Sequence, residues 1–314
     1  KRDSGEKKTG RGGFERPVRP RGKKDSAPRQ ARENPGGRPF PERRPRPKRA
    51  APAVSDDLCW GRNPVLTLLE HRPELCRKVF LLAGAQDEFR DTVARLCADG
   101  RIPLDFVERE ELERLSGGAV HQGVAARVAP IPPADLDGVV DALDPQAPAL
   151  IVLLDHCQDP HNLGAVIRTA EVAGAACVVC QNDRSATVNG TVVKTSAGAA
   201  FRLPVAQVVN VGRAVERLKR KGFWVVGLDH RTDETVWSSA LPERLALVVG
   251  SEGEGISALT AKKCDMLVKF PMAGRTGNLN ASVAAALGMF DGVHVGHQSL
   301  IRRAVALAKE LNAS

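Results

Sequence analysis

LVVGSEGEGISALTAKKCDMLVKFPMAGRTGNLNASVAAALGMF, residues 247–290, contains two apolar runs, each followed by a glycine-rich loop. The first run, Leu245 to Gly250, has strand length, and the chain then turns sharply through Ser251 to Ile256. Gly250 and Gly255 lack a Cβ, so main-chain amides can approach a ligand closely at these positions. This half of the stretch therefore predicts a buried strand followed by a backbone-lined turn.

The second run, Met266 to Phe270, predicts another buried strand, and the loop Pro271 to Asn278 follows it. A helix of small residues is predicted over Leu279 to Phe290, with Asn278, Asn280 or Ser282 available as its N-cap. Two loops at the carboxyl ends of adjacent strands would form a ligand crevice. Two ordinary strand-to-helix connections are the alternative that this loop chemistry leaves open.

The net charge of +9 over 314 residues is concentrated in one part of the chain. Residues 1–50 carry 18 Lys and Arg against six Asp and Glu, whereas residues 51–314 carry 28 against 31. Residues 1–53 are rich in Arg, Pro and Gly, a composition that predicts a disordered basic tail. Such a tail would bind phosphate backbones without sequence preference, although a purely solubilising extension remains the alternative.

The segment 54–129 has the pattern of a small α/β domain. Helices are predicted from Arg62 or Asn63, over Asp87 to Asp99 and over Arg109 to Leu115. Strands are predicted over the remaining apolar runs, at Lys78–Gly84, Leu104–Glu108 and Gly123–Val128. Residues 130–148, with five prolines, are predicted to be a linker that contains one helical turn.

Between residues 149 and 290 the apolar runs alternate with helical stretches, which predicts a mostly parallel sheet covered on both faces. Six strands are expected, at 149–155, 176–180, 205–209, 223–228, 245–250 and 266–270. Asn162 would stand at a helix start after the first strand, most simply as its cap, and Arg168 six residues later on the surface. Neither a dinucleotide-type GxGxxG nor a Walker loop follows any of these strands.

The seven cysteines are an odd number scattered through apolar runs, which favours reduced thiols and a cytoplasmic protein. Cys177 and Cys180 have CxxC spacing but lie within a predicted strand, so a buried core position is expected rather than a metal site. The sequence contains no apolar run long enough to cross a bilayer, and we expect no membrane partner.

Three motifs resemble, in order and spacing, those of the SpoU (TrmH-type) RNA ribose 2′-O-methyltransferases: Asn162–Ala170, Leu247–Ile256 and Pro271–Ala286. GRNPV (Gly61–Val65), VHQGVAARV (Val120–Val128) and VKTSAGAA (Val193–Ala200) look like the subgroup typified by the 23S rRNA guanosine 2′-O-methyltransferase. The resemblance implies S-adenosylmethionine as cofactor, an RNA substrate bound by the small N-terminal domain, and a homodimer. It also implies a SPOUT-type trefoil-knotted α/β fold. It leaves tRNA open as the substrate.

The resemblance also implies roles for individual residues. Main-chain groups of Gly250, Phe270 and Leu279 would contact the cofactor, with Met272 and Gly255 beside them. The expected catalytic set is Arg168, Asn162, Glu252, Asn280 and Ser282. In this set Glu252, Asn280 and Ser282 would shape the site, and Asn280 would also border the cofactor. Asn162 and Arg168 would face the target ribose.

Methyl transfer from a sulfonium requires alignment of a ribose hydroxyl with the methyl group and removal of one proton. The resemblance gives Arg168 the proton-handling role, but a guanidinium is a poor base because its pKa lies above about 12. Either its surroundings perturb Arg168, or it fixes a substrate phosphate while another group takes the proton. We favour the second possibility.

The segment FDGVHVGHQSLIRRA (Phe290–Ala304) resembles the HxGH nucleotide-binding motif of bacterial FAD synthetases, with His294, Gly296 and His297 in the matching places. Only 17 residues follow His297, too few for the domain that this motif serves. We therefore expect a terminal amphipathic helix from Gln298 without nucleotidyltransferase activity. An adenylyl-transferring enzyme and a non-catalytic RNA-binding protein remain the alternative functions.

Overall fold

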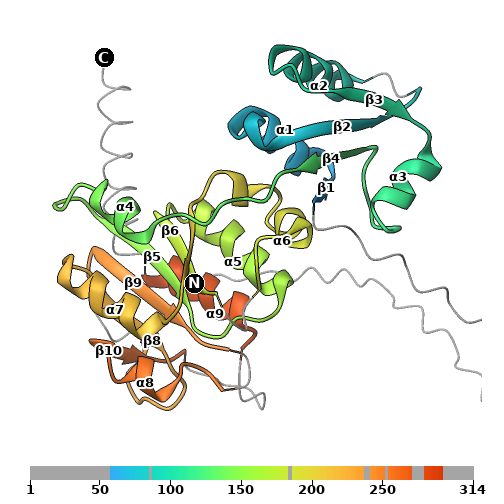
Figure 1. Cartoon of the computed structure of the whole chain (residues 1–314). Helices are drawn as coiled ribbons and strands as arrows, with labels where there is room; N and C mark the ends of the chain where they lie inside the picture. The colour runs from blue at the N-terminus through green and yellow to red at the C-terminus, as the bar shows by residue number, and fades with distance from the viewer. Residues whose placement is uncertain are drawn as a thin grey trace, which may run out of the picture. The chain divides into compact units, whose positions relative to one another are not determined.

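The computed structural model of the chain describes residues 57–84, 87–182, 186–236, 241–251, 254–270 and 279–292 (Figure 1). The predicted basic tail, Glu252, Met272 and the HxGH-like motif around His294 lie outside these residues. The described part from residue 57 onward belongs to one compact unit that spans Ala50–Ser314.

A four-stranded sheet forms the N-terminal part of this unit. Its strand order is β1-β4-β2-β3, in which β2 and β3 are parallel and the other neighbours antiparallel. The strands are β1 (Leu58–Trp60), β2 (Cys76–Leu82), β3 (Leu104–Val107) and β4 (Val124–Val128). The helices are α1 (Arg62–His71), η1 (Pro73–Leu75), α2 (Glu88–Asp99) and α3 (Arg109–Leu115).

The predicted elements of this part are confirmed to within two residues at most boundaries. Asp87 caps α2 by accepting a hydrogen bond from the Arg90 amide at 3.0 Å, as expected of an aspartate at that position. Strand β1 was not predicted, because three residues are too few to show periodicity.

A six-stranded sheet follows, with the order β10-β8-β9-β5-β6-β7 and parallel pairing throughout. All six predicted strands are present: β5 (Ala149–Leu154), β6 (Cys177–Gln181), β7 (Val205–Val208), β8 (Trp224–Leu228), β9 (Arg244–Val249) and β10 (Met266–Val268). The helices are α4 (Leu136–Asp141), α5 (Pro160–Val172), α6 (Gly190–Thr195), η2 (Ala199–Phe201), α7 (Val211–Arg220), α8 (Ala258–Ala261) and α9 (Ala281–Gly292). The predicted parallel sheet is therefore confirmed.

The strand order corrects one expectation. Strands β9 and β10, which precede the two glycine-containing loops, are not adjacent, because β8 lies between them and pairs with both. Neighbouring strands lie about 4.8 Å apart, so the two loops leave the sheet at points separated by about 10 Å. A ligand that contacts both loops must extend across the end of β8.

Helices cover both faces of this sheet (Figure 1). Ile151 and Leu153 of β5 pack with α4 and α7, whereas Leu150 and Val152 of the same strand belong to the core shared with α5 and α9. The alternation within one strand follows from the twofold repeat of a β-strand. The expected two-sided cover is therefore confirmed.

The segment predicted to be a linker packs on the sheet instead of lying free. Leu136 and Val140 of α4 are buried, and Ala134 forms a parallel bridge with Ala206 of β7. Its helix has six residues, and the Asp135 side chain caps it by accepting hydrogen bonds from the Asp137 and Gly138 amides. The prolines around it limit its length without preventing the packing.

All seven cysteines are free thiols, and burial raises the pKa of Cys177 and Cys180 to about 12. The CxxC pair is thus part of the core, as expected. Among the described residues, no three His, Cys, Asp or Glu side chains cluster as metal ligands would. The helices of the same part include none with the length and apolar character needed to span a membrane.

Candidate active site

Helix α5 begins at Pro160, earlier than predicted. Asp159 caps it by accepting a hydrogen bond from the His161 amide at 2.8 Å, and the proline occupies the first helical position, where no amide is needed. Asn162 is consequently the third residue of the helix and not its cap. Its side chain is buried, with 9% of the residue exposed, so it can serve a contact inside the protein.

Helix α9 is capped by Asn280, one of the three predicted candidates. The carboxamide oxygen of Asn280 accepts hydrogen bonds from the Ser282 amide at 2.9 Å and the Ser282 hydroxyl at 2.5 Å. A longer bond of 3.4 Å comes from the Val283 amide. Ser282 therefore supports the cap from inside the first turn.

The side-chain nitrogen of Asn280, Nδ2, donates a hydrogen bond to the side-chain oxygen of Asn162, Oδ1, at 3.1 Å. This bond brings the N-terminus of α9 against the N-terminus of α5. Each helix N-terminus carries a partial positive charge and unpaired amides, so two that converge favour an anionic group between or beside them. The structure thus brings together three of the predicted catalytic residues, Asn162, Asn280 and Ser282.

The turn after β9 closes on itself. The Ser251 amide donates to the Gly255 carbonyl at 3.1 Å, and the Gly255 amide donates to the Ser251 carbonyl at 3.0 Å. An added Cβ on Gly250 would lie 1.9 Å from the carbonyl carbon of Gly255, so only glycine fits there. Gly255 has a φ of +69°, in the left-handed region that favours glycine. The two predicted cofactor glycines are therefore in contact and present main chain, not side chains.

Two buried carboxylates hold the end of this turn, and sequence analysis did not single them out. Asp155 follows β5, and its Oδ2 accepts a hydrogen bond from the Ser257 amide at 2.9 Å. Asp229 follows β8 and binds Arg231, whose Nη2 also donates to the Ile256 carbonyl at 2.8 Å. These hydrogen bonds from Arg231 lower the pKa of Asp229. An aspartate directly after a buried apolar strand was the signal that could have revealed both residues.

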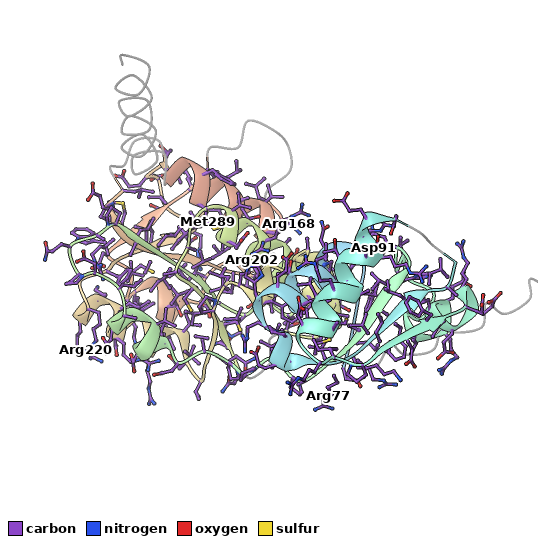
Figure 2. The ribbon with its side chains drawn as sticks, turned by 90° about the horizontal axis from the view of Figure 1, so that it is seen from above. Arg77, Asp91, Arg168, Arg202, Arg220 and Met289 are labelled. Carbon is purple, nitrogen blue, oxygen red and sulfur yellow. The ribbon has the colours of Figure 1, made fainter. Side chains whose placement is uncertain are left out.

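Arg168 lies on the exposed side of α5 (Figure 2). It stands six residues beyond Asn162, which corresponds to about 9 Å along the helix axis. Within the described residues its side chain makes neither an ion pair nor a hydrogen bond. It is not drawn into the Asn162–Asn280 contact and is available to a ligand from solution.

Two further residues were predicted to contact the cofactor, Phe270 and Leu279. Phe270 and Leu279 are both half-buried, on either side of the loop 271–278, and Phe270 packs against the core under α5 and α9. His161 lies beside Asn162, and its Nδ1 is 3.4 Å from the Thr195 hydroxyl on α6.

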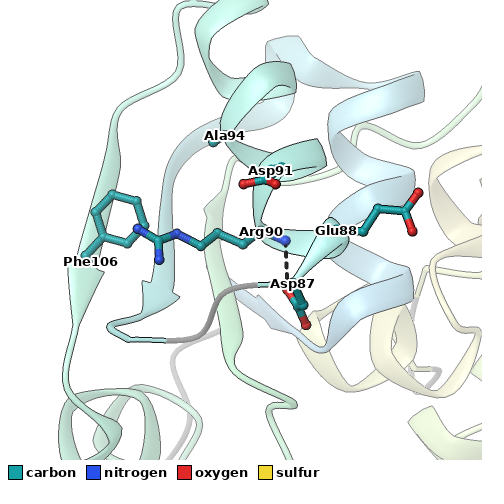
Figure 3. A pocket seen from close by; sticks show the side chains of 6 residues that line it. All are labelled: Asp87, Glu88, Arg90, Asp91, Ala94 and Phe106. Carbon is teal, nitrogen blue, oxygen red and sulfur yellow. Dashed lines mark hydrogen bonds between the residues drawn. The ribbon is translucent and has the colours of Figure 1, made fainter.

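A pocket of about 640 Å³ lies elsewhere, on the small sheet (Figure 3). The guanidinium of Arg90 stacks over the Phe106 ring at 4.6 Å, and Asp87, Glu88 and Asp91 complete much of the lining. Three carboxylates repel phosphate, so this pocket does not suit an RNA backbone.

Three known protein families match different parts of the chain. Residues 149–290 match the SpoU rRNA Methylase family, and residues 58–134 match the family described as RNA 2′-O ribose methyltransferase substrate binding. Residues 277–314 match the FAD synthetase family, in agreement with the resemblance of the HxGH-like segment.

Two curated relatives cover most of the chain. The chain is 37% identical over 237 residues to the 23S rRNA (guanosine-2′-O-)-methyltransferase RlmB of Salmonella typhimurium, a match of 76% of this chain and 98% of that protein. It is 38% identical over 240 residues to the protein of the same name from Escherichia coli K12, with the same two shares.

The fold also matches solved structures. The SpoU methyltransferase AviRb from Streptomyces viridochromogenes superposes with a TM-score of 0.64 and 25% identity, over 76% of this chain and 88% of that one. An AdoMet-bound rRNA methyltransferase from Sinorhizobium meliloti has the same fold, with a TM-score of 0.63 and 21% identity over 76% and 86% of the two chains. Together with the parallel sheet and the site around Asn162, these similarities show that the chain belongs to the SpoU rRNA methylase family.

Proposed function

We propose that this chain transfers a methyl group from S-adenosylmethionine to the ribose 2′-hydroxyl of a guanosine in 23S rRNA. The observation that carries the proposal is the Asn162–Asn280 contact, which joins two of the three family motifs at the N-termini of α5 and α9. The named activity of the two curated relatives supports this substrate.

The residues of the two loops fit this cofactor. The closed turn at Gly250 and Gly255 offers backbone amides and carbonyls without side chains, and half-buried Phe270 and Leu279 offer apolar surface. A solved relative, AviRb, is known in complex with AdoMet. When bound, the cofactor supplies a methyl group on a positively charged sulfur. Glu252 and Met272 are proposed to complete the site.

The side chains of this chain then act by position. Asn162 and Asn280 hold the ribose hydroxyl in line with the methyl group, and the two helix N-termini stabilise negative charge that develops on the oxygen. Arg168, exposed on α5, binds a neighbouring phosphate. A guanidinium is a poor base, so the hydroxyl proton passes to another acceptor.

A homodimer is proposed from the exposed apolar side chains of α9. Val283, Leu287 and Phe290 are 46%, 38% and 45% exposed, and their spacing places them along one side of the helix. Val172 on α5, the helix against which α9 packs, is 64% exposed. A second copy of the chain would remove these side chains from water. We also propose the trefoil knot of the family resemblance and a cytoplasmic location.

The test is methylation of 23S rRNA fragments and of tRNA by the purified chain with labelled S-adenosylmethionine, followed by mass spectrometry of the digested nucleosides. We expect 2′-O-methylguanosine in the 23S fragment. Methylation of tRNA alone would show that tRNA, and not 23S rRNA, is the substrate. Methylation of neither RNA, with cofactor bound normally, would refute the proposed function.

A further inference from the structure

Three motifs of the subgroup resemblance are not part of the cofactor site, and the structure brings them together. Gly61–Val65 forms the start of α1, Val120–Val128 leads into β4, and Val193–Ala200 spans the end of α6 and η2. They meet where β1 and α1 of the small sheet contact α6 and η2 of the large-sheet part.

The two parts approach each other closely at two glycines of this joint. An added Cβ on Gly190 of α6 would lie 2.0 Å from the Leu58 carbonyl oxygen, and one on Gly198 would lie 2.9 Å from the Thr67 side chain. Arg202 also donates to the Thr67 hydroxyl at 3.3 Å. Contacts this close hold the small sheet in one position against α6.

Lys194 occupies this joint in an unusual electrostatic setting. Its Nζ would lie 2.2 Å from an added Cβ on Gly61, directly before α1, and Gln122 accepts a hydrogen bond from the Arg62 amide at 3.1 Å. The side chain is half-buried, and burial lowers the pKa of its ammonium group. In the part of the chain that the structure describes, the ammonium group has neither a hydrogen bond nor an ion pair.

A cation next to a helix N-terminus is unfavourable, because both carry positive charge. An anion bound beside them would relieve this repulsion and would supply the acceptor that Lys194 lacks. Helix α6 also leads to the candidate active site, since Thr195 follows Lys194 and lies 3.4 Å from His161, the neighbour of Asn162. An anion at Lys194 therefore lies between the small sheet and the site of methyl transfer.

We infer that Lys194 is an RNA-positioning residue, which binds a backbone phosphate where the substrate passes from the small sheet to the Asn162–Asn280 site. The inference rests on the proposed function and extends it to a residue outside the cofactor loops. Its consequence is that one rigid joint sets the register between bound RNA and the reacting ribose.

The test compares Lys194→Met and Lys194→Arg with the wild type. The control is Lys262→Met, which removes the same charge from an exposed lysine after α8. RNA affinity is measured against salt concentration by fluorescence anisotropy with a 23S rRNA fragment. For Lys194→Met we expect affinity about tenfold weaker and a salt slope smaller by about 0.7 to 0.9, the contribution of one phosphate contact. Lys194→Arg should restore both, and Lys262→Met should change neither.

Other readouts separate this inference from a purely structural role and from the proposed function itself. We expect the KM for RNA to rise in Lys194→Met while S-adenosylhomocysteine affinity and the melting temperature stay near wild-type values. An unchanged salt slope, or a lowered melting temperature that Lys194→Arg does not restore, would overturn the role of Lys194. A wild-type chain that binds the fragment but does not methylate it would refute the proposed function instead.

Discussion

The amide nitrogen of Asn280 lies 3.1 Å from the carboxamide oxygen of Asn162, and this hydrogen bond joins residues 118 positions apart. The oxygen of Asn280 meanwhile caps α9 through Ser282 and Val283. The Asn280 side chain therefore has two separable roles. Its oxygen caps the N-terminus of α9, and its nitrogen connects α9 to α5. Substitutions can remove one role without the other.

Asn280→Asp keeps the capping oxygen and removes the donor that faces Asn162. Aspartate caps helices as well as asparagine does, so the melting temperature should stay close to that of the wild type. Methyl transfer should fall about tenfold to a hundredfold, because the two helix ends lose their alignment. Asn280→Ala should lose activity and also about 1 kcal/mol of stability. Wild-type turnover by Asn280→Asp, measured in single-turnover assays, would show that the Asn162 contact is not needed.

Gly250→Ala should abolish the closed turn, since its Cβ would overlap the carbonyl carbon of Gly255 at 1.9 Å. Overpacking of this kind costs about 1 to 3 kcal/mol, so affinity for S-adenosylhomocysteine should fall about tenfold to a hundredfold. Titration calorimetry measures this change. Gly212→Ala in α7 is the control, because its Cβ would meet side-chain atoms and no backbone, with Asn210 Oδ1 and Lys263 Cδ both at 3.2 Å. Equal affinities for both variants would contradict a main-chain cofactor contact at Gly250.

Arg168 offers a test of base against phosphate binder. If Arg168 binds phosphate, Arg168→Lys should retain part of the activity, and its pH–rate profile should match that of the wild type. Arg168→Ala should lower kcat/KM for RNA about tenfold or more, because a charge-assisted contact with the phosphate is lost. If Arg168 were the base, a lysine in its place, with a pKa near 10.4, would shift the pH at which the methylation rate reaches its plateau. A shifted limb in Arg168→Lys would therefore exclude the phosphate role.

Asp229 should contribute stability that depends on pH. Hydrogen bonds from Arg231 lower its pKa in the folded state, so its contribution is fully present above the unfolded value of about 3.9. It should disappear as the pH falls through the lower folded pKa. Urea unfolding of wild type and Asp229→Asn should thus differ most near pH 7 and converge in the acid range. A difference that stays constant down to pH 3 would mean that the charge of Asp229 does not matter.

Much of the large sheet was predictable because its strands are short continuous apolar runs, such as Leu245 to Val249, which are typical of buried parallel strands. Strand order was not, since periodicity within β9 and β10 carries no information about β8 between them. The start of α5 was misplaced although Asp159 and Pro160 form a recognisable cap and first position. The Asn162–Asn280 contact could be expected only from the family resemblance, because no local pattern links residues so far apart.

Exposed apolar residues of α9 lead to a prediction about assembly. Leu287 and Phe290 are 38% and 45% exposed, whereas Ala285 and Met289 on the other side of the helix are buried. Leu287→Glu combined with Phe290→Glu should leave the fold intact, because neither side chain fills the core, but should place two charges in a dimer interface. Light scattering should then give the mass of one 33.6 kDa chain for the variant and twice that mass for the wild type.

The control for this variant is Leu259→Glu in α8, where an equally apolar side chain is 75% exposed and lies outside the three family motifs. It should remain a dimer. We further propose that the dimer completes the site, so the α9 variant should also lose methyl transfer while its circular dichroism stays unchanged. A wild-type chain that is monomeric and active would remove the dimer from the mechanism. A dimeric α9 variant would instead move the interface to another face of the chain.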